Sequence, residues 1–365
     1  MKINKLQFWF GLLWTLGLCL GLTYIFLLRS EVVLIYQGKP SAWAWLVDWF
    51  YPRFWVEKQR FPLEFFLAKT DNILLRLALV LFVYSVGFYY LSQPRPKRQW
   101  QRFWQLALTA NEAKWLSRII VMLCVWASHT WAIDLTLYSE FPEFYKPIFL
   151  LKILKLPLLS AEGFYFLWGL MLISFSLTAL LGSYSLIFSL IAMTNFVLLQ
   201  GYLHSFHKID HPYVPLTFLV MLLPALVYQI QQSQFENLWT IRLMQVSIAS
   251  LYFLAGAEKI LIGGLAWFHP LNLQTHAQMH QAEWGMWLFA YEPISTLCSI
   301  FAVAIELTFP LIFYFPRFKW LFLGLGICLH LGIFLLLEVG IWLSPWVWSY
   351  VVFYKIRSTD LETNA

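Results

Sequence analysis

The stretch SLYFLAGAEKILIGGLAWFHP (residues 250–270) is apolar for most of its length, yet it carries two adjacent ionisable residues, Glu258 and Lys259. It continues an apolar run that begins near residue 243, and about twenty such residues are enough to cross a bilayer as a helix. An ionisable side chain in such a helix is costly unless it faces protein or water. The stretch therefore predicts a membrane-spanning helix and marks Lys259 as a candidate functional residue.

The composition of the whole chain has the same character. Of its 365 residues, 60% are hydrophobic and only 12% are charged, whereas soluble proteins carry about 25% charged residues. The 20 Trp and 18 Tyr residues suit the two interfacial belts of a membrane protein. Lysines and arginines in cytoplasmic loops account for the net charge of +6, and we expect membrane lipids as partners and no nucleic acid.

Apolar runs of spanning length recur along the chain, and runs this long satisfy their backbone in lipid as helices. A further run, 341–354, is short and contains Pro345, so it either crosses the membrane or re-enters it. We therefore predict an all-α, polytopic membrane bundle of nine or ten transmembrane helices. The full-length runs lie near 7–28, 72–91, 117–135, 163–181, 184–202, 213–230, 243–262, 293–315 and 319–337.

We expect three regions along the chain. Residues 1–110 form an N-terminal extension with two spans and a basic loop, residues 111–356 form the main membrane domain, and residues 357–365 form a short polar tail. The basic loop at 92–118 holds the strongest cluster of Lys and Arg, which places it in the cytoplasm. Alternation of the spans then brings Lys259 to the outer face.

Three ionisable residues inside predicted spans are candidates for chemistry. Lys259 can serve as a general base if it is removed from water, or its ammonium can instead reach the lipid headgroups. The small residues around it, AGA before and GG after, let a neighbouring helix approach closely. Glu306 and His330 lie deep in their spans. Each of these two either satisfies a hydrogen bond between helices or takes part in catalysis.

Six of the eight histidines fall in the predicted outer loops. In HSFHKIDHPY (204–213) their spacing of three and then four residues can place them on one helical face, although Pro212 limits the helix there. Asp210 can orient a histidine by accepting its ring N–H. Solvated loop histidines are the simpler interpretation, and a metal site is the alternative. The ligands of that alternative site are His204, His207, His276 and His280.

Several sequence templates are absent. There is no G-x-G-x-x-G, Walker A, G-x-S-x-G, H-E-x-x-H or C-x-x-C motif. Nucleotide chemistry and serine hydrolysis therefore have no support in the sequence.

Four segments, in the right order, resemble a known family. LMQVSIASLYFLAGAEKILIGGLAW (243–267) and IDHPYVPLTFLVML (209–222) resemble two segments of the vitamin K-dependent gamma-glutamyl carboxylases. AIELTFPLIFYF (304–315) and CLHLGIFLLLEVGIWLSPWVWSYVVF (328–353) resemble the closing spans of the broader HTTM family, the bacterial relatives of the carboxylase. The resemblance covers roughly residues 115–356.

The resemblance implies that Lys259 is the base that activates reduced vitamin K or another quinol, and that His211 lies in the same site. Glu258 stands where the carboxylase has a second basic residue, and Asp210 stands where it has Asn. No stretch resembles the large lumenal domain that grips the substrate propeptide, so we do not expect a protein substrate. The implied localisation is the inner membrane of a bacterial cell.

The expected function is therefore general-base chemistry of the lyase or oxygenase kind on a quinol or other lipid-soluble substrate at the outer membrane face. Lys259 and His211 are the expected catalytic residues. Asp210, Glu258, Glu306 and His330 are the expected supporting residues, and no metal is expected. Two alternatives stay open: a metal-dependent membrane oxidoreductase that uses the histidines, and a non-enzymatic transporter or assembly factor in which the buried charges are structural.

Overall fold

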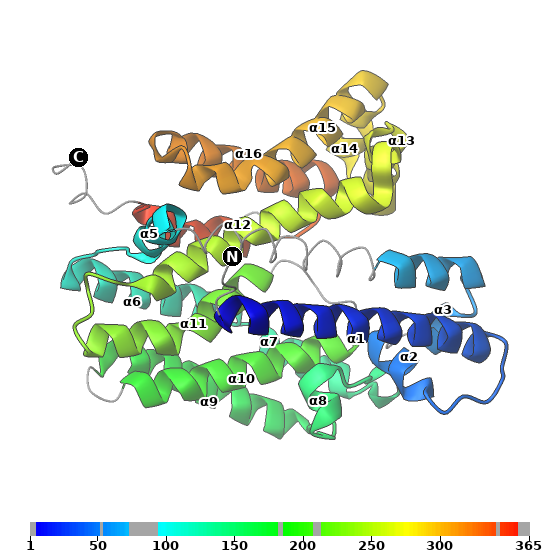
Figure 1. The fold of residues 1–365 in the computed structure, drawn as a ribbon, viewed down its shortest axis with the longest axis horizontal. Helices are drawn as coiled ribbons and strands as arrows, with labels where there is room; N and C mark the ends of the chain where they lie inside the picture. Colours follow the sequence, from blue (N-terminus) through cyan, green and yellow to red (C-terminus); the bar gives the residue numbers. More distant parts are fainter. Residues whose placement is uncertain are drawn as a thin grey trace. The chain divides into compact units, whose positions relative to one another are not determined.

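The computed structural model describes residues 5–51, 54–72, 94–181, 185–206, 213–340 and 344–356. Its described residues form helices and connecting turns and contain no strand (Figure 1). The chain divides into two compact units, Met1–Gln101 and Arg102–Ala365. The boundary predicted from sequence lies at residue 110, a short way into the second unit.

The first unit is built around one long helix. Helix α1 runs over Lys5–Tyr36 and contains the predicted span 7–28. It is followed by α2 (Ala44–Phe50), α3 (Phe54–Glu57) and a helix over 63–72. The predicted span 72–91 lies outside the described residues apart from its first position.

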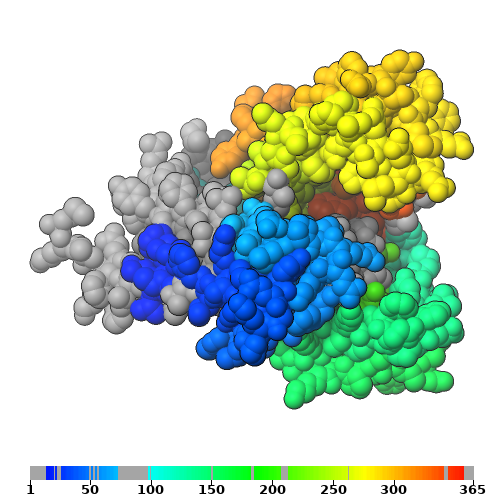
Figure 2. Space-filling view, turned by 90° about the vertical axis from the view of Figure 1, so that its right-hand side faces the viewer, coloured from blue at the N-terminus to red at the C-terminus, as the bar shows by residue number. Residues whose placement is uncertain are grey.

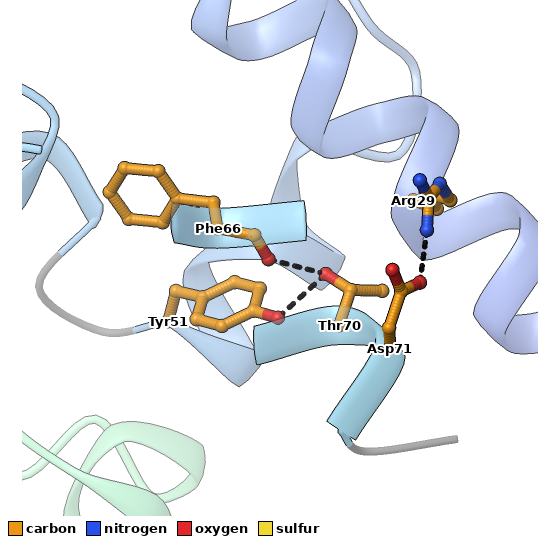
Figure 3. Close-up of polar contacts among 5 residues, drawn as sticks. All are labelled: Arg29, Tyr51, Phe66, Thr70 and Asp71. Carbon is orange, nitrogen blue, oxygen red and sulfur yellow. Dashed lines mark hydrogen bonds and ion pairs between the residues drawn. The ribbon is translucent and has the colours of Figure 1, made fainter. Parts of the chain in front are cut away.

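Polar side chains tie the short helices of this unit together (Figure 3). The hydroxyl groups of Tyr51 and Thr70 are 2.8 Å apart, and Thr70 also donates to the carbonyl of Phe66 at 2.9 Å. Arg29 of α1 forms an ion pair with Asp71. Burial of Tyr51 raises the pKa of its phenol, so the hydroxyl stays protonated and able to donate.

The second unit is a bundle of long helices that run back and forth (Figure 1). In the described part of this unit, seven segments are long and apolar enough to cross a membrane, and each overlaps a predicted span. They confirm a multi-pass membrane protein, while the total of nine or ten spans stays a prediction. These segments are Ala110–Ser139, Ala161–Leu180, Ser185–Phe206, Val214–Gln231, Trp239–Leu261, Glu292–Phe313 and Pro316–Leu337.

Local sequence sets where several of these helices begin and end. Thr109 and Glu112 form a capping box at the start of α6, and Ser160 caps α9. Glu338 adopts a left-handed conformation, with φ of 50°, where α16 ends. The helices of the seven apolar segments are α6 (Ala110–Ala127) with the shorter α7 (Trp131–Ser139), α9 (Ala161–Leu180), α10 (Ser185–Phe206), α11 (Val214–Gln231), α12 (Trp239–Glu258), α15 (Glu292–Thr308) and α16 (Lys319–Leu337).

Shorter elements connect these helices. The α-helical ones are α5 (Pro94–Trp104), α8 (Phe149–Ile153), α13 (Leu271–Met279), α14 (Glu283–Phe289) and α17 (Pro345–Ser349). The 3-10 and π-helical ones are η1 (Pro142–Phe144), η2 (Lys259–Gly263), η3 (Gly264–Phe268), η4 (Phe309–Phe313), η5 (Pro316–Phe318) and η6 (Tyr350–Tyr354). Helices α13 and α14 form a lobe, yellow in Figure 2, that exposes the side chains of Trp284 and Trp287.

The run 341–354 is not one continuous spanning helix in its described part. It contains α17 and η6, of five residues each, and together they cover only about half of a hydrocarbon core at 1.5 Å per residue. Of the two interpretations left open by the sequence, a segment that enters the bundle without a full helical crossing fits these elements better.

A buried arginine anchors this last segment to α12. The Arg242 guanidinium donates to the carbonyl groups of Phe103 at 2.8 Å and Ile356 at 2.5 Å, and to the side chain of Gln245 at 2.7 Å. Gln245 in turn donates to the carbonyl groups of Val352 and Lys355. These bonds satisfy a charged group that is only 4% exposed, and they hold η6 against the bundle.

Candidate functional site

The helix that carries Lys259 changes its winding at that residue. Helix α12 ends at Glu258, residues Lys259–Gly263 form the π-helical turn η2, and the 3-10 helix η3 follows. Gly264 permits the change from the π-helical turn to the 3-10 helix, because its backbone φ of 55° suits a residue without a side chain. Short π-helical turns inside helices occur frequently at functional sites.

Lys259 forms an ion pair with Glu306 of α15. Its Nζ donates to both carboxylate oxygens, at 2.5 and 2.6 Å. The side chain of Glu306 is 9% exposed and that of Lys259 is 23% exposed. Charges this far from water are tolerated because each compensates the other.

Gly256 brings the two helices close enough for this pair to form. A Cβ atom at Gly256 would lie 2.9 Å from the Cβ of Glu306 and 3.1 Å from the backbone nitrogen of Leu307. The close helix approach predicted from the small residues of the AGA segment is therefore confirmed. Gly256 lies one turn before Lys259, so α12 and α15 meet at the ion pair itself.

A second polar cluster lies on the same face of α12, centred on Tyr252. Its hydroxyl is 2.5 Å from Nε2 of His330 in α16 and also hydrogen bonds the hydroxyl of Tyr350 in η6. Tyr252 precedes Lys259 by nearly two helical turns, which places both on one side of the helix.

Aromatic rings surround these polar groups. The ammonium of Lys259 lies 5.5 Å from the ring centre of Trp267 in η3. The ring of His330 stacks on Trp346 of α17 at 5.4 Å, and Tyr252 stacks on Phe309 at 4.3 Å. An acid, an amine, an imidazole and two phenols therefore lie among aromatic side chains from η3, η4 and α17.

Of the residues singled out from the sequence, Lys259 and Glu306 form an ion pair, and His330 contacts Tyr252, nearly two turns before Lys259 on α12. Glu258 is exposed beside Lys259 at the end of α12. Asp210 and His211 lie outside the described residues, so their place beside Lys259 stays a prediction.

The histidines of the alternative metal site are spread over several elements. His204 lies in the last turn of α10, His276 lies in α13, and His280 caps α13, whereas His207 lies outside the described residues. No group of three or more His, Cys, Asp or Glu side chains within the described ranges is arranged to hold a metal ion. His204 instead lines a mainly apolar cavity of about 280 Å³ between α8, α10 and α11.

Sequence reasoning missed Tyr252, Tyr350, Trp267 and Trp346. A signal existed for Tyr252, because a residue seven positions before Lys259 shares its helix face. Trp267 follows Lys259 within the quoted stretch, but its position over the ammonium depends on the π and 3-10 turns. Tyr350 and Trp346 come from short helices after Pro345, and nothing in their own neighbourhood indicates that they contact α12 and α16.

The seven apolar segments and the paired charges inside their bundle define a multi-pass helical membrane protein with an internal polar site. Comparisons with family models, with curated proteins and with solved structures find no match to this chain.

Proposed function

We propose that the protein is a membrane enzyme in which Lys259 and Glu306 act as an acid–base pair on a quinol or other lipid-soluble substrate. The observation that carries this proposal is the ion pair itself, two hydrogen bonds of 2.5 and 2.6 Å inside an apolar helix bundle. The resemblance of residues 115–356 to the HTTM and carboxylase families supports the same assignment of Lys259.

The pair offers a simple route for the proton. A proton moves from Nζ of Lys259 to a carboxylate oxygen of Glu306, which leaves a neutral amine and a neutral acid. Apolar surroundings favour this exchange because they disfavour separated charges. The amine then takes the hydroxyl proton of the substrate and becomes an ammonium again, and the substrate becomes an oxyanion.

A purely structural role explains the pair less well. Replacing a buried ion pair by apolar residues of similar size is often neutral or stabilising. Ionisable residues within membrane spans are therefore functional candidates by default. The metal-dependent and non-enzymatic alternatives stay predictions, and no contact between described residues favours either of them.

Helix α12 ends on the same side of the bundle as α7, α10 and α16 (Figure 1), and Lys259 directly follows that end. The cluster of Lys and Arg in the loop 92–118 places the opposite side in the cytoplasm, so this side faces outward. The resemblance places the protein in the inner membrane of a bacterial cell. A lipid-soluble substrate reaches such a site laterally from the bilayer, which suits a protein whose second unit consists largely of apolar helices.

The test is the turnover of purified protein in lipid with a reduced naphthoquinone, followed as oxygen consumption. We expect Lys259→Ala to abolish turnover and Glu306→Gln to lower it, while both proteins still insert. Lys114→Ala, an exposed lysine at the start of α6, is the matched control and should retain turnover. Unchanged oxygen consumption in Lys259→Ala would reject the proposal.

A further inference from the structure

The cluster of Tyr252, His330 and Tyr350 has no part in the proton exchange between Lys259 and Glu306. Tyr252 is 2% exposed and Tyr350 is 7% exposed, and both hydroxyl groups are directed at the imidazole or at each other. Two buried phenols and a half-buried imidazole, joined by hydrogen bonds on the same side of α12 as Lys259, need an explanation of their own.

The chemistry of the three groups orients their hydrogen bonds. The Tyr252 hydroxyl has one proton and two partners, so it donates to one and accepts from the other. The lone pair of a neutral imidazole is a better acceptor than a phenol oxygen, and a phenol is a better donor than a neutral imidazole N–H. The chain therefore runs from the Tyr350 hydroxyl to the Tyr252 oxygen, and from the Tyr252 hydroxyl to Nε2 of His330.

This order determines the tautomer of His330. A ring whose Nε2 accepts a hydrogen bond carries its proton on Nδ1. Nδ1 makes no hydrogen bond to any part of the chain that the structure describes, and it is not a sealed, fully buried atom. The stacking of the ring on Trp346 holds its orientation. His330 thus presents a fixed N–H donor with no partner among the described residues.

We propose that His330 donates this Nδ1–H to an oxygen of the substrate, and that Tyr252 and Tyr350 act as positioning residues that fix its tautomer. The assignment rests on the proposed function, because the oxyanion that this donor would stabilise forms when Lys259 takes the substrate proton. A hydrogen bond to a charged oxygen is stronger than one to a neutral oxygen, so the donor stabilises the product of proton transfer more than the bound substrate. The ligand is a molecule with at least one ring hydroxyl or carbonyl oxygen.

The tautomer can be measured without turnover. The full-length protein, labelled with 15N at histidine and placed in lipid bilayers, should show His330 protonated at Nδ1 and not at Nε2, with His330→Gln identifying the resonances. Tyr252→Phe should abolish this preference for Nδ1. The control is Tyr145→Phe, which removes a hydroxyl that donates to the carbonyl of Leu156, and it should leave the preference intact. A wild-type His330 protonated at Nε2 would overturn the assignment.

Binding and kinetics test the role of the donor. Addition of a reduced naphthoquinone should shift the Nδ1 resonance of His330, and an unchanged resonance in a protein that turns this compound over counts against the inference. His330→Gln should lower kcat by about 10²- to 10³-fold, as the loss of one oxyanion donor does elsewhere, with little change in KM. His330→Asn, whose amide nitrogen occupies nearly the position of Nδ1, should retain more activity.

The two proposals fail in different ways. If Lys259→Ala is inactive while His330→Gln keeps the wild-type kcat, the role of His330 is wrong and the acid–base pair stands. If Lys259→Ala keeps full turnover, the proposed function is wrong and the role of His330 in it is rejected as well, whatever tautomer the ring adopts.

Discussion

The pairing of Lys259 with Glu306 is a contact that the sequence can suggest but cannot establish. Both residues stand out as charges inside apolar runs, yet 47 positions separate them along the chain. Adjacent Glu258 is the nearer carboxylate in sequence and is exposed. The partner is chosen by the packing of α12 on α15, which depends on the missing side chain of Gly256.

Removing one member of the pair should destabilise the protein more than removing both. Glu306→Leu leaves the Lys259 ammonium without its counter-charge, and such a change costs about 3–5 kcal/mol in buried pairs. The double variant Lys259→Met with Glu306→Leu should recover most of this loss. The free energy of unfolding in a detergent titration measures the effect.

Glu292→Gln serves as the control for this comparison, because Glu292 lies exposed at the start of the same helix. Its free energy of unfolding should stay within about 0.5 kcal/mol of the wild type. Additive losses in the double variant would mean that the two charges do not stabilise each other.

At the level of elements, the sequence predicts the helices better than their irregularities. The apolar run 117–135 predicts one continuous helix. The chain turns between α6 and α7, where the hydroxyl of Ser128 donates to the carbonyl of Cys124 at 2.7 Å. The apolar run 243–262 likewise predicts a regular α-helix, although the helix changes from α to π winding at Lys259. Hydropathy averages over such positions, because a π or 3-10 turn is as apolar as the α-helix around it.

Gly256 is the element-scale test of the α12–α15 contact. Gly256→Ala should lower the free energy of unfolding by about 1–3 kcal/mol, because the new methyl group overlaps the Cβ of Glu306 and the backbone of Leu307. Turnover should fall with it, since the two helices must separate at the ion pair. The same unfolding titration and oxygen assay measure both effects.

Gly324→Ala is the matched control on α16, because no atom lies within 4 Å of a Cβ at that position. It should be neutral or stabilise the protein by up to about 1 kcal/mol through helix propensity. Equal effects of the two substitutions would show that the α12–α15 contact is looser than the structure has it.

For the whole molecule, composition and hydropathy predict the class of protein and most of its described spans. Seven predicted spans coincide with long apolar helices, because the bilayer imposes the length of a helix directly on the sequence. The docking of the final segment depends on long-range contacts such as that of Arg242 with Ile356. Such contacts leave no periodic pattern in the sequence. The predicted roles of Asp210 and His211 lie outside the described residues.

The orientation in the membrane follows from the basic loop and can be tested by labelling. Gln278 in α13 and Gln234 between α11 and α12 are both exposed and lie at opposite ends of α12. In a variant without the four native cysteines, Gln278→Cys should react with an impermeant maleimide in intact cells. Gln234→Cys should react only after the membrane is opened. The reverse pattern would place the site on the cytoplasmic side.

The Arg242 anchor also has a consequence for how the protein is made. Helix α12 leaves the ribosome more than a hundred residues before its carbonyl partners at Val352, Lys355 and Ile356 are translated. During that interval the guanidinium lacks one of its three acceptors, the Ile356 carbonyl, and the Gln245 amide lacks both of its carbonyl acceptors. Buried polar groups without partners are costly, so we expect chains that stop before residue 350 to be less stable than the full chain.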